Sequence, residues 1–335
     1  MLDKRDLGTS GMSITTVGFG AWAVGGGDWT FGWGPQDDDE SIAGIVHAVK
    51  MGVNWVDTAS AYGLGHSEEV VRRALARIPA AERPFIYTKC GMVWDPEHRL
   101  APLQRISSPA SLRKDAEASL RRLGVDQIDL FQIHWPDQSG VPAEDSWGEM
   151  ARLVDEGKVR AIGVSNYDVE LLERCERVRH VDSLQPPFSM ILRDSGADVI
   201  PWCASHGTGV IVYSPMGSGI LTDSFSAARV AAMADGDWRR NSSRFNEPAL
   251  SANIALRDSL RPIAARHRTT VSAVAIAWVL SWRGVSAAIV GARRPDQVDG
   301  WLGGANLVLG ESDLAEIGAA IRRTGAGSGP VSAEA

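Results

Sequence analysis

Eight short apolar segments alternate with amphipathic helical segments along this chain, and this alternation constrains the fold more than any other feature. Each apolar segment is rich in β-branched or aromatic residues, as is typical of strands that are buried on both faces. The expected strands are residues 17–20, 54–57, 85–89, 128–134, 160–164, 183–185, 210–213 and 287–290. Strands that alternate with helices indicate an α/β fold with a parallel sheet.

Helix signals lie between these segments. After the aspartates at positions 37–39, apolar residues recur at positions 42, 45, 46 and 49, which is the spacing of one helix face. The aspartates also suit the positive N-terminus of a helix. A second helix is expected to begin at Ser108 and Pro109, because serine can cap its first turn and proline fits the first helical position. Gly124 is expected to end this helix.

Eight strands with intervening helices fit either an open sheet or a closed barrel. Two features favour the (β/α)8 TIM barrel. Most neighbouring strands are separated by roughly 25–45 residues, as a barrel chain requires, and no G-x-G-x-x-G turn follows an early strand. We expect a single domain over residues 1–335, with a core from about residue 7 to residue 321 and a flexible tail over residues 324–335.

Three connections depart from the repeating pattern. Gly8, Ser10 and Gly11 predict an N-terminal β-hairpin that caps the bottom of the barrel. Long loops are expected after the third strand, at residues 91–107, and after the seventh, at residues 217–250. Loops that follow barrel strands lie at the end where barrel enzymes place their sites, so both are candidates for function, with a solvated insertion as the alternative.

Composition excludes several classes of protein. The 34 basic and 41 acidic residues leave a net charge of −7, which favours solubility and argues against a nucleic-acid-binding surface. The three cysteines (Cys90, Cys175 and Cys203) have no metal-ligand spacing and fit a reduced compartment. The N-terminus has no apolar signal segment, and the most apolar stretch, residues 271–280, is too short to span a bilayer. We therefore expect a cytoplasmic protein without a metal, membrane or nucleic-acid partner.

Ionisable residues stand at the carboxyl ends of three successive expected strands. Asp57 ends the second strand, Lys89 the third and His134 the fourth, and Tyr62 follows in the loop after the second. Taken singly, each has a structural alternative, such as a loop cap, a solvated strand end, a loop aromatic or a buried histidine. Together, at one end of a barrel, they predict a shared catalytic site.

These four residue types suit the transfer of a proton to a carbonyl group. Asp57 and Lys89 tolerate burial together because they pair. The lysine charge is expected to lower the pKa of Tyr62 from about 10, so that the phenol can donate a proton near neutral pH. His134 would orient the carbonyl or share the proton. No serine or cysteine nucleophile with a partner base stands out, so a cofactor that supplies hydride is expected.

With these residues the sequence resembles the aldo-keto reductase family over about residues 7–321. The likeness rests on the Asp-x4-Tyr spacing and on eight segments in order. They are residues 18–22 (GFGAW), 57–63 (DTASAYG), 88–89 (TK), 133–136 (IHWP), 162–167 (IGVSNY), 185 (Q), 213–217 (YSPMG) and 291–295 (GARRP). The resemblance implies that Tyr62 is the general acid, that Lys89 tunes its pKa, that Asp57 pairs with Lys89, and that His134 orients the carbonyl.

The resemblance also implies an extended nicotinamide cofactor, NADPH or NADP+, bound without a Rossmann fold. Tyr213 would stack on the nicotinamide ring, and Arg293 would meet the 2′-phosphate, which favours NADPH while leaving NADH possible. The expected cofactor-binding residues are Trp22, Ser165, Asn166, Gln185, Tyr213, Ser214, Pro215, Met216, Gly217, Ser218, Gly291, Arg293 and Gln297, with Arg239, Arg240 and Arg244 as further candidates for the phosphates. Many relatives carry Glu-Asn near the adenine, where this chain has Gly300 and Trp301.

Fewer features of the sequence indicate the substrate than indicate the cofactor. Residues 119–124 and 134–137 resemble a bacterial branch that includes sugar- and polyol-related reductases, and this likeness favours small aldehydes such as glyceraldehyde, or sugar-derived carbonyls. We expect the pocket to be lined by tryptophans, and the candidates are Trp22, Trp94 and Trp135, with Trp29 and Trp33 at the rim.

Two other functions stay open. A regulatory subunit resembling potassium-channel β subunits would bind NADPH without turnover, although such proteins usually carry asparagine in place of the histidine at position 134. A barrel isomerase or a metal-dependent lyase would use no nicotinamide. The oligomeric state, the physiological substrate and the favoured direction of the reaction do not follow from the sequence.

Overall fold

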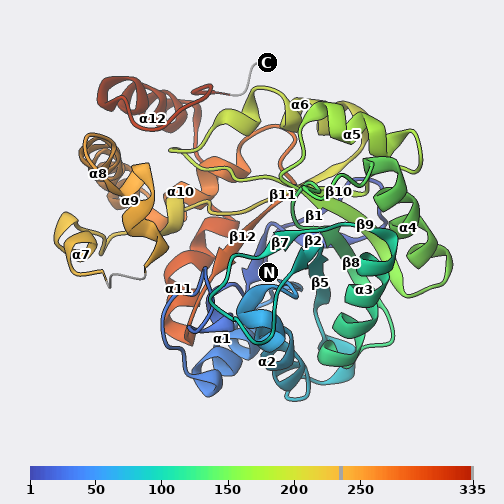
Figure 1. Cartoon of the computed structure of the whole chain (residues 1–335). Helices are drawn as coiled ribbons and strands as arrows, with labels where there is room; N and C mark the ends of the chain where they lie inside the picture. The colour runs from blue at the N-terminus through green and yellow to red at the C-terminus, as the bar shows by residue number, and fades with distance from the viewer. Residues whose placement is uncertain (234–236, 333–335) are drawn as a thin grey trace.

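The computed structural model describes residues 1–233 and 237–332. Within these residues, eight parallel strands close into a barrel and helices surround it (Figure 1), which confirms the predicted TIM barrel. Around the barrel the strands are β3 (Val17–Gly20), β4 (Trp55–Asp57), β5 (Phe85–Cys90), β8 (Ile128–Ile133), β9 (Val159–Ser165), β10 (Ser183–Gln185), β11 (Gly209–Val212) and β12 (Ala287–Gly291). Each overlaps one of the eight predicted segments, and β12 pairs with β3 to close the ring.

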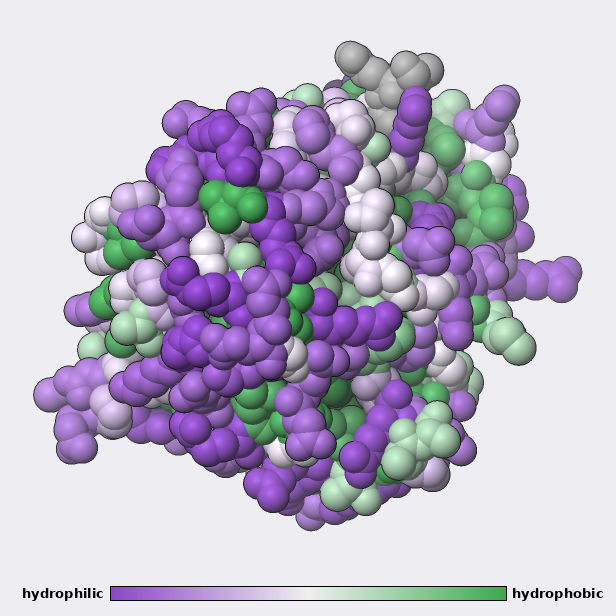
Figure 2. All heavy atoms as spheres, turned by 90° about the vertical axis from the view of Figure 1, so that its right-hand side faces the viewer, coloured by the Kyte–Doolittle hydropathy of each residue, from purple (hydrophilic) through white to green (hydrophobic). Residues whose placement is uncertain are grey.

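The helices accompany the barrel strands, and several of them, although not all, pack an apolar face on the strands. In chain order they are α1 (Asp38–Lys50), α2 (His66–Leu75), α3 (Pro109–Leu123), α4 (Ala143–Asp155), α5 (Val169–Glu176), α6 (Val199–His206), α7 (Ala227–Ala231), α8 (Ala249–Ser259), α9 (Arg261–Arg266), α10 (Val271–Leu280), α11 (Pro295–Leu302) and α12 (Glu311–Thr324). Figure 2 shows the face that carries α3 and α4, which is mainly hydrophilic with small separate apolar areas. No helix in the described residues is both long and apolar enough to cross a membrane.

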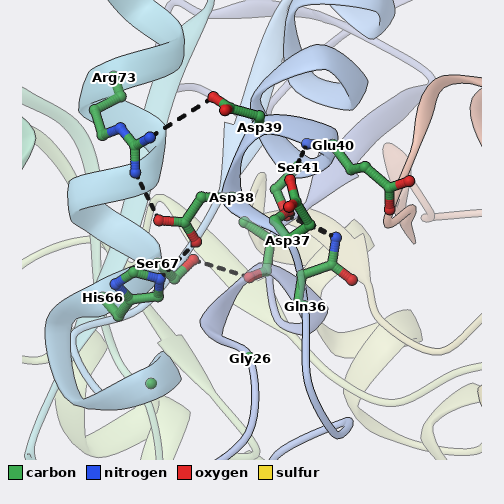
Figure 3. Close-up of polar contacts among 12 residues, drawn as sticks. Gly26, Gln36, Asp37, Asp38, Asp39, Glu40, Ser41, His66, Ser67 and Arg73 are labelled. Atoms are coloured by element: carbon green, nitrogen blue, oxygen red, sulfur yellow. Dashed lines mark hydrogen bonds and ion pairs between the residues drawn. The ribbon is translucent and has the colours of Figure 1, made fainter.

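Local signals set the helix ends as predicted. Asp37 precedes α1 and accepts a hydrogen bond from the Glu40 amide at 2.9 Å, and Ser108 caps α3 in the same way through the Ser111 amide. Gly124 ends α3 with a φ of 65°, a left-handed conformation that glycine adopts without strain. Arg73 of α2 reaches two aspartates of α1, Asp38 and Asp39 (Figure 3). Together these contacts hold α1 and α2 beside the strands whose loops form the site.

The predicted N-terminal hairpin closes the bottom of the barrel. Its strands, β1 (Lys4–Asp6) and β2 (Ser13–Thr15), pair antiparallel. Leu7, Met12 and Ile14 are fully buried and pack against side chains of the barrel interior. The Arg160 guanidinium near the start of β9 donates to the Gly11 carbonyl, so the hairpin lies at the N-terminal ends of the strands. Because this end is sealed, a ligand can enter only from the carboxyl ends.

The two long loops contain regular structure. Residues 91–107 form a small hairpin of β6 (Met92–Val93) and β7 (Gln104–Arg105). Residues 217–250 contain α7 and a 3-10 turn at Trp238–Asn241, while positions 234–236 of this predicted loop lie outside the described residues. Both loops extend from the carboxyl ends of their strands, so they flank the open end of the barrel.

The segment after α12 differs from the flexible tail that we expected. Ala326 is buried, and its carbonyl accepts a hydrogen bond from the Arg193 guanidinium at 3.0 Å. The same guanidinium binds the carbonyls of Gly329 and Pro330. One buried arginine thus holds several carbonyls of this segment, a contact between distant parts of the chain that the sequence did not predict. Residues 333–335 of the predicted tail lie outside the described residues.

Candidate active site

Strand ends bring the four candidate catalytic residues together. Asp57 is the last residue of β4, Lys89 is the second-last residue of β5, and His134 directly follows β8. Because β4, β5 and β8 are parallel neighbours in the barrel, their carboxyl ends meet at one side. Tyr62 begins a 3-10 turn (Tyr62–Gly65) after β4 and reaches back over these strand ends.

Asp57 and Lys89 form a buried ion pair. Lys89 Nζ lies 2.6 Å from Asp57 Oδ2 and also donates to the Thr58 carbonyl at 2.9 Å. Gln185 Nε2 donates to the second carboxylate oxygen of Asp57 at 3.0 Å. Burial raises the pKa of Asp57 and lowers the pKa of Lys89, and their mutual attraction opposes both shifts. The pair therefore depends on both partners being present.

The Tyr62 hydroxyl lies between the lysine and the histidine. It is 3.4 Å from Lys89 Nζ, and the Tyr62 and His134 ring centroids are 5.6 Å apart in an edge-on arrangement. Burial raises the pKa of Tyr62 well above 10, and the Asp57 charge raises it further. The expectation that Lys89 lowers this pKa is not met, because burial shifts the pKa upward and Lys89 is not among the groups that act on it. Tyr62 is a protonated phenol at neutral pH, the form that a proton donor needs.

His134 is neutral in the same site. Burial lowers its pKa well below 6.5, and the charges of Lys89 and Arg105 act in the same direction. Its Nδ1 atom is buried and has no hydrogen-bond partner among the described residues. A buried polar atom without a partner marks a position where a ligand atom or a water molecule is expected. Independently of this atom, His134 lines the cavity beside Tyr62, and a neutral imidazole carries one donor and one acceptor nitrogen, so the ring can hydrogen-bond a polar ligand there.

A second buried polar group, which sequence analysis missed, lies behind Lys89. The fully buried Glu68 accepts hydrogen bonds from the Thr88 hydroxyl and from Arg122 Nε, each at 2.6 Å. Asp115 accepts the Gly91 amide at 2.9 Å, just beyond the end of β5. Glu68 falls on the apolar stripe of α2 with Val71 and Leu75, and a carboxylate on such a stripe is the signal that could have revealed it.

The burial of Asp115 is expected to make the free energy of unfolding depend on pH. Burial raises its pKa from 3.8 to about 6, so between these values the folded chain binds more protons than the unfolded chain. Its contribution to stability therefore falls as pH rises through this window and is lowest above about pH 6. We expect Asp115→Asn to gain about 1–3 kcal/mol relative to wild type between about pH 4 and pH 7. Chemical denaturation across this pH range measures the free energy of unfolding of both proteins, and Asp126→Asn, at an exposed position, is the control. If the free energies of unfolding of wild type and Asp115→Asn change with pH in parallel, the prediction is contradicted.

The residues expected to hold the nicotinamide lie beside this site. Tyr213 donates from its hydroxyl to Asn166 Oδ1 at 2.8 Å. Asn166 Nδ2 donates to the His134 carbonyl and to the Ser165 hydroxyl, both at 3.0 Å. Asn166 has a φ of 62°, so its backbone turns sharply at the end of β9. Ser165, Asn166, Gln185 and Tyr213 all line one cavity of about 910 Å³ together with Tyr62 and His134.

The residues expected to hold the phosphates extend along the same cavity. Its lining includes Trp22, Ser214, Pro215, Met216, Ser218, Gly291, Arg293 and Gln297. Gly217 is not among the lining residues; a Cβ there would meet the Ile191 side chain, so its role is a tight turn. The Arg293 guanidinium donates to the Pro35 carbonyl and to Gln36 Oε1, and its amide donates to Gln297 Oε1 at 2.7 Å. Gln36 is in turn held by Ser41 at the start of α1 (Figure 3).

These residues fit a nicotinamide dinucleotide. The cavity lies at the upper end of the usual size range for ligand pockets, about 300–1,000 Å³. Its lining carries five arginines (Arg105, Arg229, Arg239, Arg244 and Arg293) but only two aspartates (Asp57 and Asp223), and Asp57 is already paired. An excess of guanidinium groups suits phosphates. Arg240, a further candidate, donates to the Met233 carbonyl and is not among the lining residues.

Aromatic rings enclose the mouth of the cavity. Trp22, Trp29, Trp33 and Trp135 line it as expected, whereas Trp94 does not. Sequence analysis missed Trp238, which lies in the loop after β11 and stacks on Trp22 with ring centroids 5.5 Å apart. Arg239 lies 4.6 Å above the Trp33 ring. The loop after β11 therefore covers the loop after β3, a contact between segments more than two hundred positions apart that no local pattern reveals.

Known proteins share this architecture. The Aldo/keto reductase family matches residues 16–322. The NADH-specific methylglyoxal reductase of Escherichia coli (strain K12) is 31% identical over 96% of this chain and 100% of its own length, and aldo-keto reductase YhdN of Bacillus subtilis (strain 168) is 30% identical over 96% and 95%. The structure of glycerol dehydrogenase AKR11B4 from Gluconobacter oxydans is 34% identical with a TM-score of 0.88 over 99% of both chains.

The predicted resemblance is confirmed by these comparisons. This chain belongs to the aldo/keto reductase family. It is an NAD(P)H-dependent oxidoreductase that reduces carbonyl groups. A nicotinamide cofactor, which the residues Asn166, Gln185 and Tyr213 along the cavity would hold, would supply hydride, and the protein would then have to protonate the carbonyl oxygen.

Proposed function

We propose that this enzyme reduces small aldehydes or sugar-derived carbonyls with NADPH, and that Tyr62 donates the proton. The observation that carries this proposal is the placement of the Tyr62 hydroxyl 3.4 Å from the Lys89 amine, with the Tyr62 ring edge-on to the His134 ring. An aldehyde oxygen between Tyr62 and His134 would receive the phenolic proton while hydride adds to the carbon. The Lys89 charge, held by Asp57, would then stabilise the phenolate that remains.

The names of two relatives support a small substrate. The Escherichia coli relative is named for methylglyoxal and the Gluconobacter oxydans relative for glycerol, and both compounds have three carbons. The aromatic mouth formed by Trp22, Trp33 and Trp238 supports a compact substrate because the rings enclose the space in front of Tyr62. We therefore infer that glyceraldehyde and methylglyoxal are suitable first substrates.

Steady-state oxidation of NADPH in the presence of glyceraldehyde tests this function. We expect turnover that depends on the aldehyde, together with quenching of tryptophan fluorescence on cofactor binding, since Trp22 lines the cavity. Quenching without turnover would favour the regulatory-subunit alternative. No quenching and no turnover with either NADPH or NADH would favour an isomerase or a lyase.

Arg293 is the basis for proposing NADPH, and its removal tests the preference. We expect Arg293→Ala to raise KM for NADPH by about 10–100-fold, the value of a charged hydrogen bond, with a much smaller effect on KM for NADH. The relative from Escherichia coli is NADH-specific, so both cofactors are compared in wild type and variant. Arg294→Ala serves as control, because Arg294 is exposed and pairs with Asp296. An equal effect on both cofactors would remove Arg293 from this role.

A further inference from the structure

One arginine of the cavity lies on its catalytic side. Arg105 ends the short β6–β7 hairpin in the loop after β5, and its guanidinium lies 4.2 Å above the ring of Trp135. Trp135 follows His134 in the chain, and both line the cavity together with Arg105 and Tyr62. The other lining arginines come from different loops: Arg229, Arg239 and Arg244 follow β11, and Arg293 follows β12. Arg105 is therefore separate from the group assigned to the cofactor.

Arg105 has no acidic partner among the described residues. Its guanidinium contact is the Trp135 ring, and no ion pair joins it to a described carboxylate. The carboxylate of Asp137 lies on the same segment but accepts the Ser107 amide at 2.6 Å and the Val141 amide at 2.9 Å. Stacking on tryptophan fixes a guanidinium without neutralising it. The half-buried charge of Arg105 is thus held in place and available to a ligand.

The charge of Arg105 is close enough to act on His134 in the candidate catalytic site. Beside burial and Lys89, Arg105 contributes to the lowered pKa of His134. Apolar side chains, including Met92 and Leu103, share this part of the lining. A guanidinium in such surroundings binds a carboxylate or a phosphate more strongly than it would in water, because the local dielectric constant is lower.

We propose that Arg105 forms an anion subsite for the substrate, so that the enzyme prefers aldehydes that carry a carboxylate or a phosphate over their neutral analogues. This inference rests on the proposed function and adds the charge of the substrate to it. The aldehyde group would lie at Tyr62 and His134, while the anionic group of the same molecule would bind the guanidinium above Trp135. Arg105 then determines specificity by binding and takes no part in proton transfer.

Matched substrates test the subsite. The ratio of kcat/KM for 4-carboxybenzaldehyde to kcat/KM for its neutral methyl ester measures recognition of a carboxylate. The corresponding ratio for glyceraldehyde 3-phosphate and glyceraldehyde measures recognition of a phosphate. In wild type we expect at least one ratio above unity, and Arg105→Gln should lower it by about 10–100-fold, since charged hydrogen bonds are worth this much. Arg105→Lys, which keeps the charge, should retain part of the preference.

The controls separate this inference from the function itself. Arg83→Gln removes an equal charge just before β5, away from the cavity, and should leave both ratios as in wild type. Turnover of the neutral aldehydes with ratios that Arg105→Gln does not change would overturn the anion subsite alone. If wild type turns over none of the four aldehydes, the proposed function fails and the subsite with it. If Arg105→Gln does not fold, benzoate and benzamide are compared as competitive inhibitors of aldehyde reduction by the wild type. Inhibition by benzoate but not by benzamide supports the subsite, and equal inhibition by both overturns it.

Discussion

Replacing Tyr62 with phenylalanine is expected to lower kcat by about 10²–10⁴-fold, the usual contribution of a positioned general acid. Phenylalanine keeps the ring that packs edge-on against His134 and removes only the hydroxyl that lies 3.4 Å from Lys89 Nζ. Asn166 and Tyr213, which we propose to bind the cofactor, form their hydrogen bonds with groups other than this hydroxyl. The dissociation constant of NADPH should therefore stay close to that of wild type.

Single-turnover and steady-state kinetics with glyceraldehyde, combined with a fluorescence titration of NADPH, measure both quantities. Arg99→Gln is the matched control, because Arg99 donates to the Gly63 carbonyl beside Tyr62 without reaching its hydroxyl. A kcat within a few-fold of wild type in Tyr62→Phe would remove the tyrosine from its role as proton donor. Loss of cofactor binding would show instead that the hydroxyl helps to shape the cavity.

Replacing Lys89 with methionine is expected to destabilise the fold by about 3–5 kcal/mol as well as to abolish most activity. Methionine has nearly the length of lysine but no charge, so the buried Asp57 carboxylate would lose the ammonium 2.6 Å away. Only the Gln185 amide would then remain as its side-chain donor. Because burial already raises the pKa of Asp57, the unpaired carboxyl would protonate more readily, and the loss of stability should shrink at acid pH.

The double variant Lys89→Met with Asp57→Asn separates stability from activity. Asparagine at position 57 removes the unpaired carboxylate charge and still accepts the hydrogen bond from Gln185. We therefore expect the double variant to regain about 1–3 kcal/mol of the lost stability. Activity should stay low, because no ammonium remains beside Tyr62. Thermal or urea unfolding and kcat of wild type, Lys89→Met and the double variant provide the comparison. If the double variant is no more stable than Lys89→Met, the ion pair does not account for the stability of this buried site.

The barrel was predictable because its signal is local. Strands buried on both faces, such as 17–20 and 209–212, must be apolar along their whole length, and the helices between them must carry one apolar face. Every predicted strand bound lies within one residue of the observed one. The hairpin at the bottom was likewise marked by Gly8 and Gly11, both of which have positive φ angles.

The meeting of Asp57, Tyr62, Lys89 and His134 also followed from the sequence, because parallel strands bring their carboxyl ends to one side. The electrostatic state of the site did not follow. The pKa of Tyr62 depends on how much water the surrounding loops exclude, and that is set by residues from many segments. The buried position of Glu68 and the anchoring of the tail by Arg193 depend on the same kind of distant contact.

The sequence by itself determined the order of strands and helices, the barrel that they form and the end of the barrel at which ionisable side chains gather. These properties depend on periodicity and on chain direction, which every short segment carries. Only the tertiary structure decided that burial raises the pKa of Tyr62, that Trp238 stacks on Trp22, and that Arg105 lies on Trp135 with no acidic partner among the described residues. Such properties arise from desolvation and from contacts between loops far apart in the chain, and no local pattern encodes them.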